Sequence, residues 1–585
     1  MATHTLSFKP NVDMYGGHDP SAALFEDGEL AFAVEEERLS REKHASDSFP
    51  TRAIQACLDA RGLALGDVDR ILVPHVPDLR ENIVSSHYLP DALTVPGALN
   101  KLVALEDLAK TLVKARYRPD AVIENHLREL GDELPPIEHL SHHACHAASA
   151  FHPSGFDEAL VVTVDAKGEY DSTVVWRGDP DGLTRLHTYE HPNSLGLFFA
   201  VVTEFLGYRM FNGEGKVMGL APYGEQNATI ERELRDLVTT GVDYDVTPLT
   251  KRWGTGYGVR KLEEVFGRER NDTPGEFDQW EKDLAYTAQK LLEEIVVDIV
   301  EAYAEAIDGH DVGLAGGVAL NCKLNKRIRE HDAVEELFVQ PVANDAGLAL
   351  GAGWLEQDPG EVPEQTTVAF GPSYDGDEIR SRLEEAKVDY HEPDDVERLV
   401  AERLADGDLV GWFQGRQEVG PRALGHRSIL ADPRTAESRD RVNEFVKHRE
   451  GWRPFAPSIL ADAAEEYFVD AAPSPFMIDT FDVEPARRDE VAAVLHPADD
   501  TTRPQTVSVE QNRRYYRLIA EFESITGVPA LLNTSFNDHG EPIVTTPAEA
   551  LKDFYAMGLD LLVLEDVVVE KSDADVEQAQ TPQSC

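Results

Sequence analysis

Apolar and polar positions near the amino terminus predict a short strand, a glycine-rich turn at 16–20 and then a β-hairpin. The hairpin strands are expected at Ser21–Leu24 and Leu30–Val34, joined by an Asp-Gly turn. A second block repeats this pattern. It predicts three short strands, at Val161–Asp165, Ser172–Trp176 and Leu183–Tyr189. The repetition indicates two similar hairpin-rich halves.

Helical spacing of apolar residues follows each block. It predicts helices near Pro50–Ala60 and Leu102–Tyr117, and a long amphipathic helix over Phe277–Ile307. An apolar strand then leads into paired glycines at 316 and 317. Two hairpin-plus-helix halves, with polar residues at their facing strand ends, predict a duplicated actin-like (ASKHA, ribonuclease H-like) α/β fold.

The chain has 585 residues, too many for one hydrophobic core, so several domains are expected. Segment 357–368 begins with a Pro-, Gly- and acid-rich stretch that lacks periodicity, and it is predicted to be a linker. It separates an N-terminal domain, 1–356, from a second α/β domain, 369–570. The polar residues 571–585 are predicted to be a disordered tail.

Charge and cysteine content narrow the class of protein. The net charge of −53 is spread along the chain and predicts a salt-adapted (halophilic) protein without a basic face for nucleic acid. The sequence has no long apolar run for a membrane span and no signal peptide. Four scattered cysteines, without metal or disulfide spacing, fit a reducing compartment. We therefore expect a soluble, cytoplasmic protein with no membrane partner.

Two histidines suggest a metal site. His142 and His146 are four residues apart, so on a helix both imidazoles lie on one face. Asp165 ends an apolar run and Asp345 lies at a strand-to-helix turn, so both carboxylates are candidates to complete the ligand set. Such mixed ligands suit iron, manganese or zinc. The alternative is a pair of core histidines near capped turns.

Several residues are candidates for substrate contacts. His18 lies in a glycine-flanked turn at a strand end, where it can act as a general base or only fix the turn. Lys216 lies in a glycine loop, and paired glycines let backbone amides approach a phosphate. The candidate phosphate contacts in this half are Lys216, Gly316 and Gly317.

One basic stretch interrupts the acidic chain. Residues 416–453 hold eight Arg and one Lys against six acidic residues, and Arg and Lys side chains bind phosphate oxygens. Nearer the end, the hydroxyl and amides of 533–537 are further candidates for phosphate or metal. The alternative for the basic stretch is an interdomain salt-bridge network.

Eight motifs together resemble the NodU/CmcH-type O-carbamoyltransferases, in order along nearly the whole chain. They are 17–23 (GHDPSAA), 35–38 (EEER), 142–150 (HHACHAASA), 216–224 (KVMGLAPYG), 316–321 (GGVALN), 420–425 (GPRALG), 446–450 (VKHRE) and 533–537 (NTSFN). Pro20 and His426 depart from residues common in that family. The resemblance implies an actin-like N-terminal domain and a YrdC-like C-terminal domain.

The resemblance also implies an activity and its residues. The C-terminal domain would convert ATP, with Mg²⁺, and carbamoyl phosphate to carbamoyl adenylate. The N-terminal domain would pass the carbamoyl group to a hydroxyl-bearing acceptor beside Fe²⁺ or another divalent transition metal. The implied metal ligands are His142, His146, Asp165 and Asp345; His18 and Lys43 would face the carbamoyl group; and Lys216, Gly316, Gly317 and Asn321 would bind the adenylate. ATP and carbamoyl phosphate would bind Arg422, Lys447, Arg449, Arg503, Ser535 and Asn537.

Two alternatives remain open from the sequence. A threonylcarbamoyl-type tRNA-modifying transferase uses the same modules but needs a basic surface for tRNA. A non-catalytic ATP-binding protein of the actin fold would leave the C-terminal motifs without a role. The acceptor, the metal and the oligomeric state, a homo-oligomer included, are not decided by the sequence.

Overall fold

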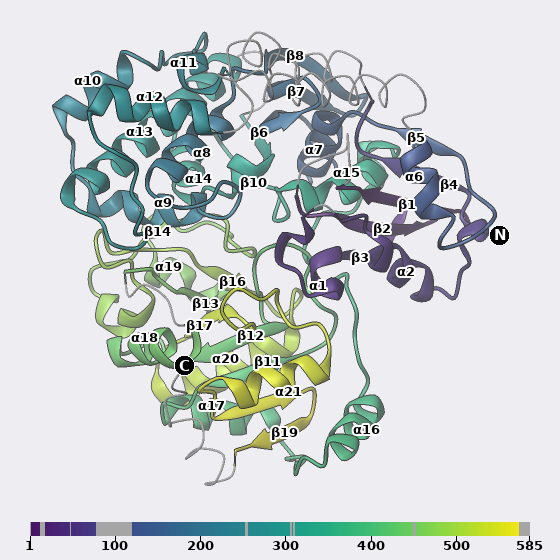
Figure 1. Cartoon of the computed structure of the whole chain (residues 1–585). Coiled ribbons are helices and arrows are strands. Elements are labelled where there is room, and N and C mark those ends of the chain that lie inside the picture. Colours follow the sequence, from purple (N-terminus) through teal and green to yellow (C-terminus); the bar gives the residue numbers. More distant parts are fainter. Residues whose placement is uncertain are drawn as a thin grey trace, which may run out of the picture. The chain divides into compact units, whose positions relative to one another are not determined.

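The computed structural model describes residues 2–11, 18–46, 48–77, 120–251, 255–304, 307, 310–447 and 452–571 (Figure 1). The predicted helix Leu102–Tyr117, part of the glycine turn at 16–20, and all but the first residue of the predicted tail lie outside these ranges. The chain divides into two compact units. Unit 1 is Met1–Glu36 with His44–Gln365, and unit 2 is Glu37–Lys43 with Thr366–Cys585.

The first sheet of unit 1 has the strand order β3-β2-β1-β4-β5. Its strands β1 to β3 form an antiparallel meander, and β4 and β5 run parallel to β1. Leu6 pairs with Leu24 in this register, and both are fully buried. The bounds are β1 (His4–Lys9), β2 (Ser21–Glu26), β3 (Glu29–Glu35), β4 (Arg70–Val73) and β5 (Ile137–His139). The predicted hairpin is confirmed as β2 and β3.

The second sheet repeats this topology, in the order β10-β9-β6-β7-β8. Strands β6 to β8 form the antiparallel meander, and β9 and β10 run parallel to β6. The bounds are β6 (Ala159–Gly168), β7 (Asp171–Asp179), β8 (Gly182–Glu190), β9 (Val312–Ala315) and β10 (Leu337–Val339). The predicted duplicated fold is confirmed. The strands are longer than predicted because backbone pairing continues beyond the apolar residues, through a bulge after Val164.

Helices pack on these sheets, and one of them, α7 (His142–Phe151), carries two of the site residues. The predicted helix at 50–60 is α2 (Thr51–Asp59), and the long predicted helix is α13 (Gln279–Ala304). Helices α7 and α15 (Leu348–Leu355) pack together, and a Cβ at Gly351 would overlap the carbonyl of Cys145. The other helices of this unit are α6 (Asp120–Leu127), α8 (Leu195–Phe205), α9 (Glu214–Leu220), α10 (Ala228–Arg235), α11 (Thr247–Thr250), α12 (Gly256–Phe266) and α14 (Cys322–Arg329), and α1 (Glu36–Ser40) runs from unit 1 into unit 2.

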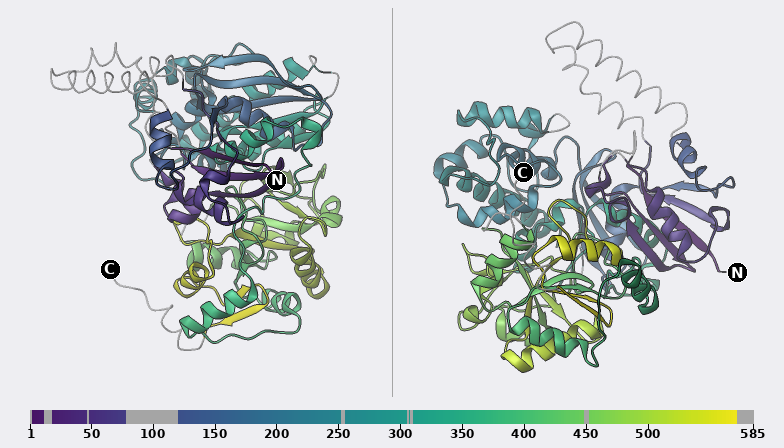
Figure 2. Two further views of the ribbon diagram at one scale, coloured as in Figure 1. Left: turned by 90° about the vertical axis from the view of Figure 1, so that its right-hand side faces the viewer. Right: turned by 60° about the horizontal axis from the view of Figure 1, so that its bottom comes forward.

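Unit 2 contains a seven-stranded mixed sheet, in the order β16-β13-β17-β12-β11-β18-β19, drawn green to yellow in Figure 2. Its strands are β11 (Val410–Phe413), β12 (Arg427–Ala431), β13 (Ala456–Leu460), β16 (Gln505–Val507), β17 (Ala530–Ser535), β18 (Leu561–Leu564) and β19 (Val567–Glu570), and β14 (Phe481–Asp482) pairs with β15 (Thr501–Thr502). Its helices are α16 (Gly376–Ala386), α17 (Val396–Ala405), α18 (Ala436–Val442), α19 (Ala464–Tyr467), α20 (Arg513–Thr526) and α21 (Pro547–Ala556). This architecture agrees with the predicted α/β class. Among the helices of the described ranges, none combines the length and the apolar character needed to cross a membrane.

Candidate metal centre and anion-binding cluster

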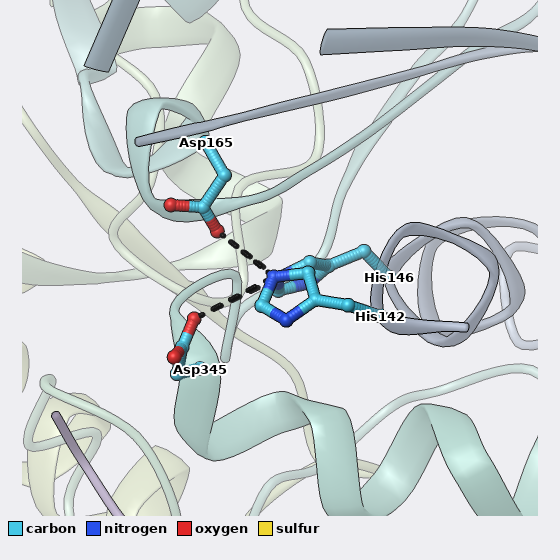
Figure 3. A group of neighbouring side chains, drawn as sticks. All are labelled: His142, His146, Asp165 and Asp345. Carbon is cyan, nitrogen blue, oxygen red and sulfur yellow. Dashed lines mark hydrogen bonds and ion pairs between the residues drawn. The ribbon is translucent and has the colours of Figure 1, made fainter. Parts of the chain in front are cut away.

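Four buried side chains of unit 1 converge on one point (Figure 3): His142 and His146 from α7, Asp165 from β6 and Asp345. Oδ2 of Asp165 lies 3.2 Å from Nε2 of His146 and 3.5 Å from Nε2 of His142. Oδ1 of Asp345 lies 3.8 Å from Nε2 of His142. One ligand atom from each residue falls within 4.8 Å of the others. The structure thus brings together the four predicted ligands.

Local structure explains how these residues meet. Helix α7 begins at His142, whose backbone N–H donates to Glu169 at 3.0 Å, so a carboxylate satisfies the first turn of the helix. Glu169 directly follows the end of β6, the strand that carries Asp165. A Cβ at Gly168 would overlap the imidazole of His142, so only glycine leaves that ring its place. One strand end therefore supports two of the four residues.

The donor set fits a divalent transition metal. Nε2 of His142 is buried and makes no hydrogen bond to any described residue, and an unpaired buried imidazole nitrogen opposite two carboxylates is expected to have a further partner. Burial acts to raise the pKa of Asp165, but the imidazoles of His142 and His146 that face it hold that pKa well below its usual range. The carboxylate is therefore ionised, as a metal ligand must be. His143 faces elsewhere, with Nδ1 2.9 Å from the hydroxyl of Thr163.

His18 lies in a polar turn of the same unit. Its Nδ1 lies 2.7 Å from Oδ2 of Asp19, and its ring packs at a tilt of 38° against Phe211, with centroids 4.4 Å apart. Asp19 also contacts His44 at 2.8 Å and accepts a hydrogen bond from Asn344 at 2.8 Å. Burial acts to lower the pKa of His18, but Asp19 outweighs it and raises the pKa to about 9. The imidazole of the metal-free protein therefore carries a proton at neutral pH, which favours charge stabilisation over general-base action.

Of the residues predicted to contact the adenylate, one lies at the metal centre and two have structural partners. The N–H of Gly317 points at Oδ2 of Asp165, at 3.4 Å, and Gly316 adopts a φ of 89° that favours glycine. The side chain of Asn321 caps α14 and accepts from the N–H of Leu324 at 3.1 Å. The 3₁₀ turn Gly317–Leu320 lies between Gly316 and α14. Lys216, on α9, has its ammonium 4.7 Å from the centroid of the Tyr208 ring.

A buried lysine lies among polar groups in unit 2. Lys447 ends a short π-helical turn, Asn443–Lys447, and is only 6% exposed. Its ammonium donates to the carbonyl of Ser535 at 2.7 Å, and to the carbonyl and side-chain oxygen of Asn537 at 2.9 and 3.0 Å. The hydroxyl of Ser535 donates to Oδ1 of Asn537 at 2.6 Å. Three predicted contacts of ATP or carbamoyl phosphate therefore adjoin one another. Arg422 and Arg503 are half-buried in the same unit, and Arg449 lies outside the described residues.

Most of the basic stretch has structural partners within unit 2. Arg427 is fully buried, donates to the carbonyl of Gln414 at 2.8 Å and lies over the ring of Phe413. Arg434 pairs with Asp432 at 2.6 Å, and Arg441 with Asp560 at 2.8 Å. The positive charge of 416–453 thus serves in large part to hold this unit together. Lys43 lies at the end of Glu37–Lys43, the short segment that belongs to unit 2.

The sequence patterns did not indicate three residues that contact the candidate metal centre. Lys9 pairs with Asp345, and Gly168 and Glu169 fix His142. A lysine that ends the apolar run of β1 was the available signal for the first. No periodic pattern marks the other two, because their role depends on a contact with a helix earlier in the chain.

The repeated sheets and the buried His–Asp cluster define a duplicated actin-like α/β protein with a candidate metal centre. Residues 12–354 match the family model described as Carbamoyltransferase N-terminus, and residues 401–571 match Carbamoyltransferase C-terminus. The chain belongs to the carbamoyltransferase family. The predicted resemblance is thereby confirmed, and with it the prediction of a transferase enzyme.

Similar proteins cover nearly the whole chain. Nodulation protein NolNO of Sinorhizobium fredii is 37% identical over 584 residues, which cover 97% of this chain and 81% of the relative. The uncharacterized protein sll1178 of Synechocystis is 38% identical over 595 residues, or 95% of each chain. A solved structure of full-length HypF, in a phosphate- and nucleotide-bound form, is 12% identical with a TM-score of 0.33, covering 60% of this chain and 55% of that chain.

Proposed function

We propose that the protein makes carbamoyl adenylate in unit 2 and transfers its carbamoyl group to a hydroxyl in unit 1. The observation that carries this proposal is the buried quartet of His142, His146, Asp165 and Asp345, in a chain that matches both carbamoyltransferase models. The acceptor is a hydroxyl of a small molecule or sugar.

In unit 2, ATP and carbamoyl phosphate would react with one water to form carbamoyl adenylate, pyrophosphate and phosphate. Both substrates are polyanions, which a buried ammonium stabilises strongly. Lys447 supports this role because its ammonium is buried and adjoins Ser535 and Asn537, two other residues that the family resemblance implies for these substrates. Arg422, Arg449 and Arg503 would add contacts to the phosphates, with Mg²⁺ bound to ATP.

In unit 1, the acceptor oxygen would attack the carbamoyl carbon, and AMP would leave with the electrons of the broken C–O bond. The proton of the acceptor hydroxyl would pass to the phosphate of the departing AMP or to water. A divalent metal such as Fe²⁺, held by His142, His146, Asp165 and Asp345, would supply charge stabilisation there. His18, whose Nδ1 lies 2.7 Å from Asp19, would face the reacting carbamoyl group, as the family resemblance implies. The N–H of Gly317, which points toward Asp165, and the ammonium of Lys216 would contact the adenylate or its carbamoyl group.

Exchange of labelled pyrophosphate into ATP tests the first step directly. The proposal expects exchange only when carbamoyl phosphate is present, since the carbamoyl group must accept the adenylate. Exchange that is indifferent to carbamoyl phosphate would contradict a carbamoyl-adenylate mechanism. Transfer is then followed by mass spectrometry of cell extracts incubated with the enzyme, where one metabolite should gain a single carbamoyl group.

The charge of the protein bears on the salt concentration in which it works. A net charge of −53 repels itself in dilute buffer, whereas molar salt shortens the screening length to roughly 3 Å. We therefore place the protein in a salt-adapted cytoplasm. Refolding yield should fall steeply below about 1 M salt, where self-repulsion is less screened. A yield that does not depend on salt would contradict this assignment.

A further inference from the structure

Lys9 is a buried cation beside the candidate metal centre. It ends β1 and is only 5% exposed. Its ammonium lies 3.0 Å from Oδ2 of Asp345 and donates a hydrogen bond to the backbone carbonyl of His18 at 3.0 Å. One side chain thus contacts both a candidate metal ligand and the turn that carries the candidate catalytic imidazole.

A buried ammonium is costly unless its charge and its donors are satisfied. The carboxylate of Asp345 balances the charge of Lys9. Burial acts to raise the pKa of Asp345, and the charge of Lys9 is the main cause that lowers it. The two oxygens of Asp345 are therefore divided. Oδ2 faces Lys9, while Oδ1 faces Nε2 of His142 at 3.8 Å.

We propose that Lys9 is a positioning residue of the metal centre. It reserves Oδ2, so that Asp345 offers a single oxygen to a divalent ion, and it holds the His18 turn at a fixed place beside that oxygen. This inference rests on the metal centre of the proposed function. It assigns a role to a residue that none of the recognised motifs contains.

The charge of Lys9 also sets how tightly the ion binds. An ammonium next to a ligand carboxylate repels a divalent cation, and that repulsion is large at low effective dielectric. The wild-type site therefore binds its ion less tightly than its four ligands would without Lys9. In return, Lys9 keeps Asp345 and the His18 turn in fixed positions. Loss of the charge should tighten binding and at the same time slow carbamoyl transfer.

Lys9→Met tests this combination in the full-length protein, at molar salt, by competitive titration with Zn²⁺ and Co²⁺. The expected affinity is at least about tenfold tighter than that of the wild type, because one nearby positive charge is gone. Turnover of the transfer step should fall at least about tenfold, while pyrophosphate exchange in unit 2 is unchanged. A merely structural defect would weaken metal binding, so equal or weaker affinity overturns the proposal.

Two further variants serve as controls. Lys9→Arg keeps the charge, so metal affinity should return to the wild-type value while transfer stays slow. Lys290→Met also removes a lysine paired with a buried carboxylate, Glu293 at 2.7 Å, but one outside the metal cluster, and should leave metal affinity unchanged. If Lys9→Met does not fold, Lys9→Gln carries the same expectation, because it removes the charge and keeps a donor.

Metal binding by the wild type and by the neutral variants tests the metal centre and the role of Lys9 separately. If the wild type binds no divalent ion, the metal centre of the proposed function is wrong. If the wild type binds the ion and neither neutral variant binds it more tightly, the role of Lys9 is wrong and the proposed function still stands.

Discussion

The candidate metal centre of unit 1 was predicted from residue spacing and strand ends, and the basic stretch of unit 2 from its charge, and the two regions differ in the structure. In unit 1, four ionisable groups from three separate segments face one another, with an imidazole nitrogen left without a hydrogen bond among the described residues. In unit 2, arginines such as Arg427 and Arg441 donate to nearby carbonyls and carboxylates. Local charge density is therefore a weaker indicator of a site than convergence of buried groups.

The largest expected effect is the loss of pyrophosphate exchange when Lys447 is removed. Lys447→Ala should lower carbamoyl-phosphate-dependent pyrophosphate exchange by about 10² to 10³-fold, because a preorganised buried cation is lost. The measurement is the exchange rate at saturating ATP. Lys552→Ala, which removes an exposed lysine paired with Glu541, should retain full exchange. Normal exchange in Lys447→Ala would remove this cluster from the proposed site.

The next effect tests whether the two units divide the work. His146→Ala should lose metal binding and carbamoyl transfer, since one of four ligands is gone, while pyrophosphate exchange continues at the wild-type rate. Metal content and both rates are measured on the same preparation. If exchange also disappears, the assignment of adenylate formation to unit 2 alone is incorrect.

A smaller effect examines how the centre is supported. Gly168→Ala introduces a methyl group where the ring of His142 lies, so metal affinity should fall about 10- to 100-fold, as for other changes that displace a ligand. Gly360→Ala is the matched control, because a Cβ there meets no atom within 4 Å. Equal metal affinity in the two variants would show that His142 tolerates displacement.

The smallest effect concerns stability outside the site. Burial raises the pKa of Glu36 from 4.5 to about 7, despite a hydrogen bond from the N–H of Ala53. The folded state therefore holds the proton more tightly than the unfolded state, and the free energy of unfolding falls as pH rises from about 4.5 to 7. The wild type loses free energy of unfolding on the order of 1–3 kcal/mol above pH 7, and Glu36→Gln should abolish that loss.

Denaturant unfolding at pH 5 and pH 8, in molar salt, checks this prediction. The variant should gain stability relative to the wild type at pH 8 and show little difference at pH 5. A variant that is less stable at both values would mean that the Glu36 carboxylate is stabilised by a contact other than that with Ala53.

Much of the fold and part of the site followed from local patterns. The β2–β3 hairpin, the second meander and α13 were predicted with errors of a few residues at their ends, because alternation and helical spacing report burial directly. The pairing of His142 with His146 needs only the helical repeat. Their meeting with Asp165 and Asp345 was expected from strand ends and the family resemblance, and the structure places the four together.

Other features depend on residues far apart in the chain, so only the tertiary structure decided them. The basic stretch cannot be sorted into binding and structural arginines until the carbonyls and carboxylates around it are placed. Segment Glu37–Lys43 belongs to unit 2 although its neighbours on both sides belong to unit 1. Lys9 and Asp345 are joined by a contact of two buried charges, and such a contact has no periodic signal in the sequence. Periodicity thus determined the elements and the helical ligand pair, whereas burial and charge pairing between distant segments determined how the centre is held.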